Sequence, residues 1–370
     1  MRDVSFLPNE KGKKKMKTEA TQKKSKLPKI ILICLLVIIA VFIAVCAYWH
    51  EATYAVFKNV TVKKYKLAEP DSWDGGEAMM KIPYAEDSDS QYLDLYMPNM
   101  PEGEKPQLYV IIHGGGFISN DSESRQARLM YDYFRDHGFA CASINYRLAP
   151  EAEFPGALAD CKAAIRFLKA HADEYGYNAE RVPVFGESAG GYLAVMCGVT
   201  PDDAFSTVDF IGHEDAPDVT ADVDVVVDYY GHVDNRGAED DWAELRIPKF
   251  IRSIANAWVS GEKAGGYEDV ESYWFRKNVS EMTEEEYAER DPHAWIDKTD
   301  ISEKAFLIHH GDCDITVPYY QSVRLYEHVS GKIDADKLVY ELVPGMGHAS
   351  DPMYSEEQLA KVEEFLKKVL

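Results

Sequence analysis

A serine stands between two glycines in the run Gly186-Glu187-Ser188-Ala189-Gly190. Residues 182–185 before it are apolar as in a buried strand, and residues 188–198 are rich in Ala, Leu and Val as in a helix. On a sharp strand-to-helix turn, glycines two residues either side of the serine prevent collisions, and the hydroxyl is exposed at the helix N-terminus, whose positive end stabilises negative charge. The run therefore predicts that Ser188 is a nucleophile.

A second motif, His113-Gly114-Gly115-Gly116, directly follows the apolar residues 107–113. Glycines let the backbone approach a substrate closely, so the N–H groups of Gly115 and Gly116, together with that of Ala189, are predicted to form an oxyanion hole. The alternative, a phosphate-binding loop, requires a GxGxxG pattern or a Walker lysine, and the sequence contains neither.

A serine nucleophile needs a histidine base, and that histidine needs a carboxylate to orient it. Asp312 and Asp314 follow the apolar residues 305–310, and His348 lies in a glycine-containing loop after residues 337–343. Both loops follow the carboxyl ends of predicted strands, where α/β sheets bind ligands. The chain order of nucleophile, acid and histidine predicts His348 as the base and leaves two aspartates as candidates for the acid.

The elements that must position these residues alternate along the chain. Their apolar runs are continuous, as in strands that are covered on both faces, so we predict an α/β domain of three layers. Strands are predicted over residues 107–113, 139–146, 182–185, 223–230, 305–310 and 337–343, and helices over 124–136, 156–174, 188–198, 319–330 and 355–369. Residues 231–304 interrupt the alternation, and loops of this length are usually functional lids or insertions.

The charge of the chain is divided unevenly. The sequence has 40 Lys and Arg against 63 Asp and Glu, a net charge of −23. Residues 1–29 carry ten basic and three acidic side chains, a net charge of +7, so the rest of the chain has a net charge of −30. Nucleic-acid binding requires clustered Lys and Arg, so the acidic body argues against nucleic acid as a partner.

Residues 30–49 are uncharged and rich in Ile, Val, Leu and Ala. About twenty such residues in a helix span a bilayer core, so we predict a transmembrane signal anchor here, with the membrane as a partner. A buried core helix and a cleaved signal peptide, cut after Val45-Cys46-Ala47, are the alternatives. The positive-inside rule places the basic residues 1–29 in the cytoplasm and the catalytic domain outside the cell; cleavage would make the protein secreted.

After the anchor, residues 50–79 are predicted to form a juxtamembrane stem and residues 80–370 the catalytic domain, with its insertion at about 231–304. Cys141, Cys161, Cys197 and Cys313 are scattered through this domain without metal-binding spacing. We interpret them as apolar core residues, with a structural disulfide as the alternative, and expect no metal site.

The motifs together resemble the α/β-hydrolase esterases, above all the hormone-sensitive-lipase-like carboxylesterases and the bacterial feruloyl- or acetyl-esterase-like (BD-FAE-type) hydrolases. The resemblance covers roughly residues 80–370 and is carried by His113-Gly114-Gly115-Gly116, Asn145-Tyr146-Arg147-Leu148-Ala149-Pro150, Gly186-Glu187-Ser188-Ala189-Gly190-Gly191, Asp314 before Val317-Pro318, and Gly347-His348. It implies an eight-stranded, mostly parallel sheet with helices on both faces and a lid or cap insertion.

The resemblance also assigns residues. It implies a Ser188, Asp314 and His348 triad, because the family acid lies three residues after the strand-end glycine, and it gives Tyr146, Arg147 and His113 a structural role around the oxyanion loop. Two features depart from the hormone-sensitive-lipase-like pattern. That group usually has Asp where this chain has Glu187. It also has a cap before the sheet, whereas the candidate cap of this chain is the insertion at residues 231–304.

The sequence thus predicts a membrane-anchored, extracellular serine carboxylesterase without a metal or organic cofactor. The acidic body favours neutral esters, of short acyl chains or of carbohydrate- or phenolic-linked acyl groups, over polyanionic substrates. A serine peptidase is one alternative, because the same triad cleaves amides. A catalytically silent extracellular binding module is another, although an intact triad argues against it.

Overall fold

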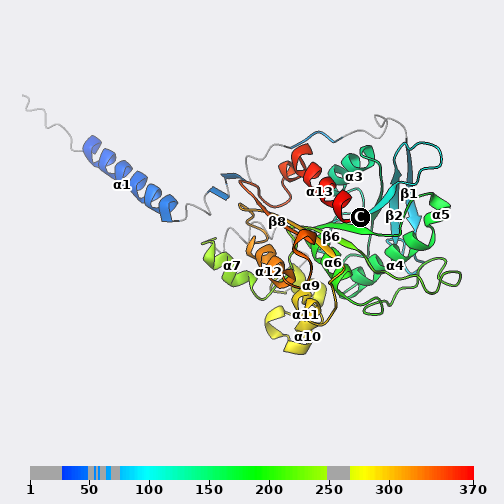
Figure 1. Ribbon diagram of the computed structural model, residues 1–370. Helices are drawn as coiled ribbons and strands as arrows, with labels where there is room; N and C mark the ends of the chain where they lie inside the picture. The colour runs from blue at the N-terminus through cyan, green and yellow to red at the C-terminus, as the bar shows by residue number, and fades with distance from the viewer. Residues whose placement is uncertain (1–26, 49–53, 56, 59–63, 68–75, 248–266) are drawn as a thin grey trace, which may run out of the picture. The chain divides into compact units, whose positions relative to one another are not determined.

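The computed structural model describes residues 27–48, 54–55, 57–58, 64–67, 76–247 and 267–370 (Figure 1). The chain divides into two compact units, Met1–Tyr48 and Trp49–Leu370. The described part of the first unit is the helix α1, Leu27–Tyr48. All the strands described below belong to the second unit.

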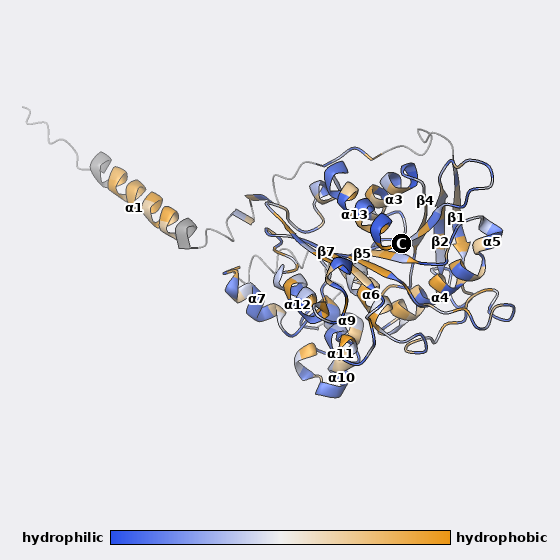
Figure 2. Cartoon of the chain, in the orientation of Figure 1, coloured by the Kyte–Doolittle hydropathy of each residue, from blue (hydrophilic) through white to orange (hydrophobic). Residues whose placement is uncertain are grey.

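The helix α1 agrees with the helix predicted over residues 30–49, of which residue 49 lies outside the described residues. Its described side chains run from residue 31 to residue 44 and are exposed and apolar (Figure 2). Among the described residues, no helix combines the length and apolar character required to cross a membrane. The predicted membrane span therefore finds no support in the structure.

The second unit is built on one eight-stranded sheet in the order β1-β2-β4-β3-β5-β6-β7-β8. The pairs β1/β2 and β2/β4 are antiparallel and all the others are parallel. The mostly parallel sheet of eight strands is as predicted. The strands are β1 Glu77–Pro83, β2 Tyr92–Met97, β3 Gln107–Ile112, β4 Phe139–Ile144, β5 Pro183–Glu187, β6 Val225–Tyr229, β7 Ala305–Gly311 and β8 Leu338–Val343.

Successive side chains of a strand point to opposite faces of the sheet. Both faces therefore carry apolar side chains, and helices cover both. In β3, Leu108, Val110 and Ile112 join one apolar core while Tyr109 and Ile111 join a second core on the other face. The first core includes α4 Gly156–Ala170, α6 Ala189–Val199 and α12 Tyr320–Val329, and the second includes α3 Arg125–Asp136 and α13 Glu356–Val369 (Figure 1). The short helix α5 Ala172–Tyr175 follows α4. The predicted three-layer arrangement is confirmed.

The predicted insertion lies between β6 and β7, with residues 248–266 outside the described residues. It contains α7 Ala238–Glu244, α9 Val270–Phe275, α10 Glu284–Ala288, α11 Pro292–Ile296 and the 3₁₀ helix η3 Val279–Glu281. The indole of Trp274 on α9 is fully buried and stacks on Phe117, with ring centroids 3.9 Å apart. Phe117 directly follows the triple glycine, so the insertion packs on the predicted oxyanion loop.

The N-terminal edge of this unit differs from the prediction. The strands β1 and β2 were not expected, and β1 begins at Glu77, three residues before the predicted domain start. Part of the predicted stem also contacts the sheet unit: the Tyr65 backbone N–H donates to the Asp351 carboxylate, and the Arg125 guanidinium donates to the Tyr65 carbonyl. Residues before 80 therefore contribute to the folded body.

The cysteines have the predicted environment. Cys141, Cys161, Cys197 and Cys313 are all buried, and none of these four is in a disulfide bond. Burial raises the pKa of the Cys197 thiol to about 12, so this side chain stays neutral and serves as a small apolar group. The alternative of a structural disulfide is wrong for these four residues.

Candidate active site

Ser188 occupies the turn between β5 and α6. Its backbone has φ 55° and ψ −120°, a conformation that is strained for a residue with a side chain. A neighbouring strand and the following helix hold it there: the Ser188 N–H donates to the Tyr229 carbonyl on β6 (2.9 Å), and the Ser188 carbonyl accepts from the Tyr192 N–H on α6 (3.1 Å). The predicted strand-turn-helix context of Ser188 is therefore present.

The glycines around Ser188 are required by close packing of the backbone. A Cβ on Gly186 would lie 1.9 Å from the Gly190 carbonyl oxygen, and one on Gly190 would lie 2.2 Å from the Ile112 carbonyl oxygen. Both contacts are with backbone atoms, which cannot turn away as a flexible side chain can. The turn therefore folds only with glycine on both sides of the serine.

We expect Gly186→Ala to lower the free energy of unfolding by about 2–3 kcal/mol, the upper range for overpacking, because the new methyl group displaces the Gly190 peptide. Urea unfolding measures this loss. The control is Gly103→Ala, whose φ is 87° but whose Cβ would have nothing within 4 Å. There only backbone strain remains, about 1 kcal/mol. Equal stability of the Gly186 variant and the unmodified chain would refute the packing argument.

The structure brings the three predicted triad residues together. His348 Nε2 lies 3.0 Å from Ser188 Oγ, and His348 Nδ1 lies 2.6 Å from Asp314 Oδ2. The residues come from loops after β5, β7 and β8, whose carboxyl ends meet at one edge of the parallel sheet. The Tyr230 ring packs against the imidazole of His348, with centroids 4.8 Å apart. The arrangement can pass the serine proton to a histidine that a carboxylate orients.

The structure also distinguishes between the two aspartates that are candidates for the acid. Asp314 is buried, and its Oδ1 atom accepts the backbone N–H groups of Thr316 (2.8 Å) and Val317 (2.9 Å). Asp312 instead accepts the N–H of Gly345 and so fixes the loop that carries His348. Only Asp314 contacts the His348 ring, which agrees with the choice implied by the resemblance.

The negative charge of Asp314 and a positive charge on His348 stabilise each other. Burial alone would raise the pKa of Asp314, but the opposing charge and hydrogen bond of His348 hold it well below its usual range. Burial likewise disfavours charge on His348, and the Asp314 carboxylate outweighs it, so the pKa of His348 is raised. Asp314 therefore stabilises the imidazolium that forms when His348 takes a proton.

The predicted oxyanion loop lies beside Ser188. Gly115 and Gly116 have φ values of 113° and 61°, which residues with a side chain rarely adopt. Gly116 and Ala189 line the same cavity as Ser188, and Gly115 directly precedes Gly116. A loop with these glycines can aim backbone N–H groups at a developing oxyanion.

Glu187 has a role that the sequence did not reveal. Its buried carboxylate accepts the Gly114 N–H (2.7 Å) and so ties the oxyanion loop to the residue before Ser188. Burial raises the pKa of this carboxyl. The residue that departs from the hormone-sensitive-lipase-like pattern thus holds the loop in place directly.

His113 and Tyr146 brace the oxyanion loop, as the resemblance implies. Their rings stack with centroids 4.3 Å apart, and the Tyr146 hydroxyl donates to the His113 carbonyl (2.8 Å). Burial lowers the pKa of His113 to about 4, so its ring is neutral. Arg147, next to Tyr146 in the chain, binds the buried Asp160 carboxylate (2.8 Å). None of the hydrogen bonds, ion pairs and ring contacts described for these residues is with Ser188, which agrees with a structural role.

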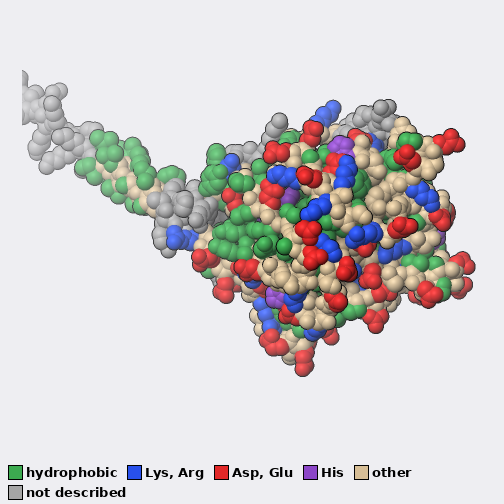
Figure 3. Space-filling view, viewed as in Figure 1, with side chains coloured by type: hydrophobic (Ala, Val, Ile, Leu, Met, Phe, Trp, Pro, Cys, Tyr) green, Lys and Arg blue, Asp and Glu red, His purple; other side chains and the backbone are tan. Residues whose placement is uncertain are grey.

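A cavity of about 390 Å³ opens at Ser188, within the size range of small-molecule sites. Besides Ser188, Ala189 and Gly116, the insertion provides most of its wall, including His232, Asn235, Arg236, Glu268 and Glu271. Figure 3 shows Asp and Glu side chains spread over the visible face of the molecule, with Lys and Arg between them. The described residues include no group of three or more His, Cys, Asp and Glu that could hold a metal ion.

His232 and Glu271 are cavity residues that sequence reasoning missed. A signal for His232 existed, because it follows the predicted strand 223–230 and therefore lies at the same sheet edge as the triad. For Glu271 there was none, because it reaches the cavity only through the packing of the insertion.

Comparisons with known proteins agree with this geometry. The model of the BD-FAE family matches residues 93–329. Among curated proteins, the chain is 26% identical over 271 residues to esterase LipC of Mycobacterium tuberculosis, which covers 72% of this chain and 58% of that protein. It is 26% identical over 293 residues to the probable carboxylic ester hydrolase LipM of the same organism, covering 78% and 60%. The chain thus spans about three-fifths of the length of these relatives.

A solved structure shows the same fold. A truncated carbohydrate esterase from gut microbiota matches with a TM-score of 0.62 and 24% identity over 82% of this chain and 99% of that chain. This match shows that the two chains share a fold.

Proposed function

The chain belongs to the BD-FAE family, and from this we propose that it is a serine hydrolase of carboxylic esters that forms an acyl-enzyme on Ser188. The observation that carries the proposal is the unbroken contact from Ser188 Oγ to His348 Nε2 (3.0 Å) and from His348 Nδ1 to Asp314 (2.6 Å). The names of the relatives LipC and LipM, both ester hydrolases, support it.

The proposed reaction has two halves, formation of the acyl-enzyme and its hydrolysis, and the same residues act in both. Ser188 Oγ attacks the ester carbonyl carbon while His348 Nε2 takes its proton, and the N–H groups of Gly115, Gly116 and Ala189 bind the oxyanion. His348 then protonates the departing alcohol. In the second half His348 takes a proton from water, the hydroxide attacks the acyl group, and the proton returns to Ser188 as the acid leaves.

The substrates that fit best are neutral esters, of short acyl chains or of carbohydrate- or phenolic-linked acyl groups. Among the described residues, the wall of the cavity combines Glu268 and Glu271 with one arginine, Arg236, which disfavours an anionic substrate. The carbohydrate esterase with the same fold supports this substrate class.

A series of p-nitrophenyl esters from acetyl to long-chain acyl, given to the full chain, tests the proposal. We expect rapid turnover that is fastest for short acyl chains, because a cavity of about 390 Å³ is shared between both halves of the ester. The matched peptide p-nitroanilide distinguishes a peptidase. No turnover of any ester by folded protein would contradict the esterase proposal, and amide turnover alone would favour the peptidase.

We further propose that the catalytic unit works outside the cytoplasm, anchored or released by cleavage. The support is the charge pattern of the sequence, with +7 in residues 1–29 and −30 afterwards, and the apolar residues between. Protease added to intact cells that express the full chain should remove a C-terminal tag, whereas a tag that stays protected until lysis would place the catalytic unit inside.

A further inference from the structure

A second histidine, His310, lies against the acid of the triad. It belongs to β7, and its side chain is fully buried. Its Nε2 atom lies 3.4 Å from Asp314 Oδ2, the same carboxylate oxygen that His348 Nδ1 contacts at 2.6 Å. The Asp314 carboxylate therefore lies between two imidazole rings, of which that of His348 is hydrogen-bonded to Ser188.

The partners of His310 fix which of its nitrogens carries a hydrogen. Nε2 lies 2.9 Å from the Val317 carbonyl oxygen, which can only accept, so Nε2 must carry a hydrogen and donate it. Nδ1 lies 2.7 Å from Ser322 Oγ, and a hydroxyl donates to this nitrogen in the neutral ring and accepts from it in the charged ring. In both states of the ring, therefore, an N–H group lies beside the Asp314 carboxylate.

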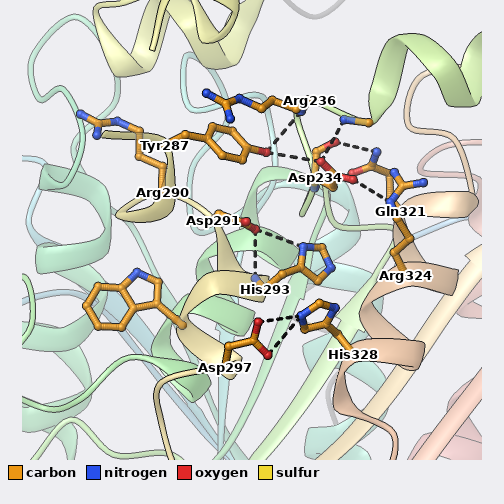
Figure 4. Close-up of polar contacts among 12 residues, drawn as sticks. Asp234, Arg236, Tyr287, Arg290, Asp291, His293, Asp297, Gln321, Arg324 and His328 are labelled. Atoms are coloured by element: carbon orange, nitrogen blue, oxygen red, sulfur yellow. Dashed lines mark hydrogen bonds and ion pairs between the residues drawn. The ribbon is translucent and has the colours of Figure 1, made fainter. Parts of the chain in front are cut away.

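Ser322 is held in place by the helix that carries it. It is fully buried on α12, and its neighbours on that helix bind the loop that follows β6 (Figure 4). Gln321 Nε2 donates to the Asp234 carbonyl (2.8 Å), and Arg324 pairs with the Asp234 carboxylate (2.6 Å). Because α12 is anchored in this way, the Ser322 hydroxyl keeps the His310 ring in one position.

A donor at this position meets two requirements of the triad. The first is charge: burial raises the pKa of Asp314, whereas His348 and, after it, His310 lower this pKa. The second is orientation, because a carboxylate that turns away from His348 Nδ1 no longer holds the imidazole for Ser188. A buried N–H group beside Oδ2 satisfies both requirements, since it favours the charged form of the carboxylate and restricts its rotation.

We propose that His310 is a positioning residue of the triad, whose Nε2–H group keeps the Asp314 carboxylate ionised and turned toward His348. The proposal rests on the proposed esterase function and deepens it, because it adds a buried fourth residue on which the orientation of the base depends. His310 acts through Asp314, since its described polar side-chain contacts are with Asp314, Val317 and Ser322. Its loss should therefore lower kcat and leave the binding of the ester unchanged.

Two variants of the full chain, alike in chemistry, test this role. In His310→Gln the side-chain amide reaches the former Nε2 position, where its N–H can donate to Asp314. In His310→Asn the shorter side chain reaches only the former Nδ1 position, beside Ser322. We expect His310→Asn to lower kcat for p-nitrophenyl acetate about tenfold, as for the loss of one hydrogen bond, with KM within about twofold. His310→Gln should keep kcat within about threefold of the unmodified chain.

A combined variant shows whether the effect passes through Asp314. In the Asp314→Asn background, His310→Asn should lower kcat by less than about a further twofold, because the carboxylate that His310 supports is gone. His328→Gln is the matched control. The Nε2 atom of His328 also lies beside an aspartate, Asp297 (3.3 Å, Figure 4), but His328 is not among the described residues that line the cavity at Ser188, so kcat should stay unchanged.

The proposal is overturned if both His310 variants lose activity equally, if His310→Asn keeps kcat within about twofold, or if its loss is the same in the Asp314→Asn background. Urea unfolding of each variant identifies a loss that follows stability, which would likewise assign His310 to the core alone. Turnover of p-nitrophenyl acetate by the unmodified chain separates the two levels. Where it is present and one of these results is found, only the role of His310 fails. Where no ester is turned over, the esterase function fails and the role of His310 with it.

Discussion

Ser188→Ala is expected to lower kcat for ester hydrolysis by about 10⁴-fold or more, because removal of the nucleophile leaves only binding and the oxyanion hole to accelerate attack by water. The variant should fold normally. The Ser188 side chain makes a hydrogen bond to His348 Nε2 (3.0 Å). The two backbone hydrogen bonds that hold Ser188 do not involve this side chain, so they remain in the variant. The effect is therefore on chemistry rather than on stability.

Hydrolysis of p-nitrophenyl acetate and covalent labelling by a fluorophosphonate measure this effect separately. The unmodified chain should gain the mass of one phosphonyl group on the peptide that contains Ser188, and the variant should gain none. Ser302→Ala, at an exposed serine, is the control and should keep both properties. A Ser188 variant that is still labelled, or that keeps a tenth of the turnover, would show that another residue is the nucleophile.

The parts of the site that sequence reasoning predicted share one physical property. Ser188, Asp314 and His348 each follow a parallel strand, and parallel strands end at one edge of a sheet, so chain order alone brings the three loops together. The glycines needed no tertiary knowledge either. Their positions follow from backbone geometry within a few residues of the serine and of His113.

The strands β1 and β2 were missed for local reasons. The strand β1, Glu77–Pro83, is mostly exposed, so it lacks the apolar run that marks a covered strand. The strand β2 contains a buried charge, Asp94, whose carboxylate accepts the Lys81 N–H (2.7 Å) and the Ser122 hydroxyl. A buried aspartate with partners in two other segments cannot be recognised from its own neighbours in the sequence.

The cavity wall was unpredictable because it is made by contacts between distant residues. His232 and Glu271 are 39 positions apart, and Asp234 and Gln321 are 87 positions apart. Such pairs form only when the insertion has packed on α12 and on the sheet. The triad was therefore predictable from motifs, whereas the residues that line the cavity required the fold.

Asp314→Asn is expected to reduce kcat by about 10³–10⁴-fold, because an amide can hold His348 in the wrong tautomer and does not stabilise the imidazolium. Asp312→Asn is the matched control. Its Oδ1 atom can still accept the Gly345 N–H, and Asp312 has no contact with the His348 ring, so activity should stay within about threefold of the unmodified chain. Equal losses in both variants would contradict the assignment of Asp314 as the acid.

The pH dependence of the remaining activity gives the second readout. The base must be neutral, so kcat/KM falls as the pH drops through the pKa of His348 in the free enzyme. In the unmodified chain Asp314 raises that pKa, which places the acid limb above the usual histidine value of about 6.5. In Asp314→Asn this charge is gone and burial lowers the pKa, so the acid limb should move to lower pH. In Asp312→Asn it should stay. An acid limb that does not move in Asp314→Asn would show that the carboxylate of Asp314 does not set the charge of His348.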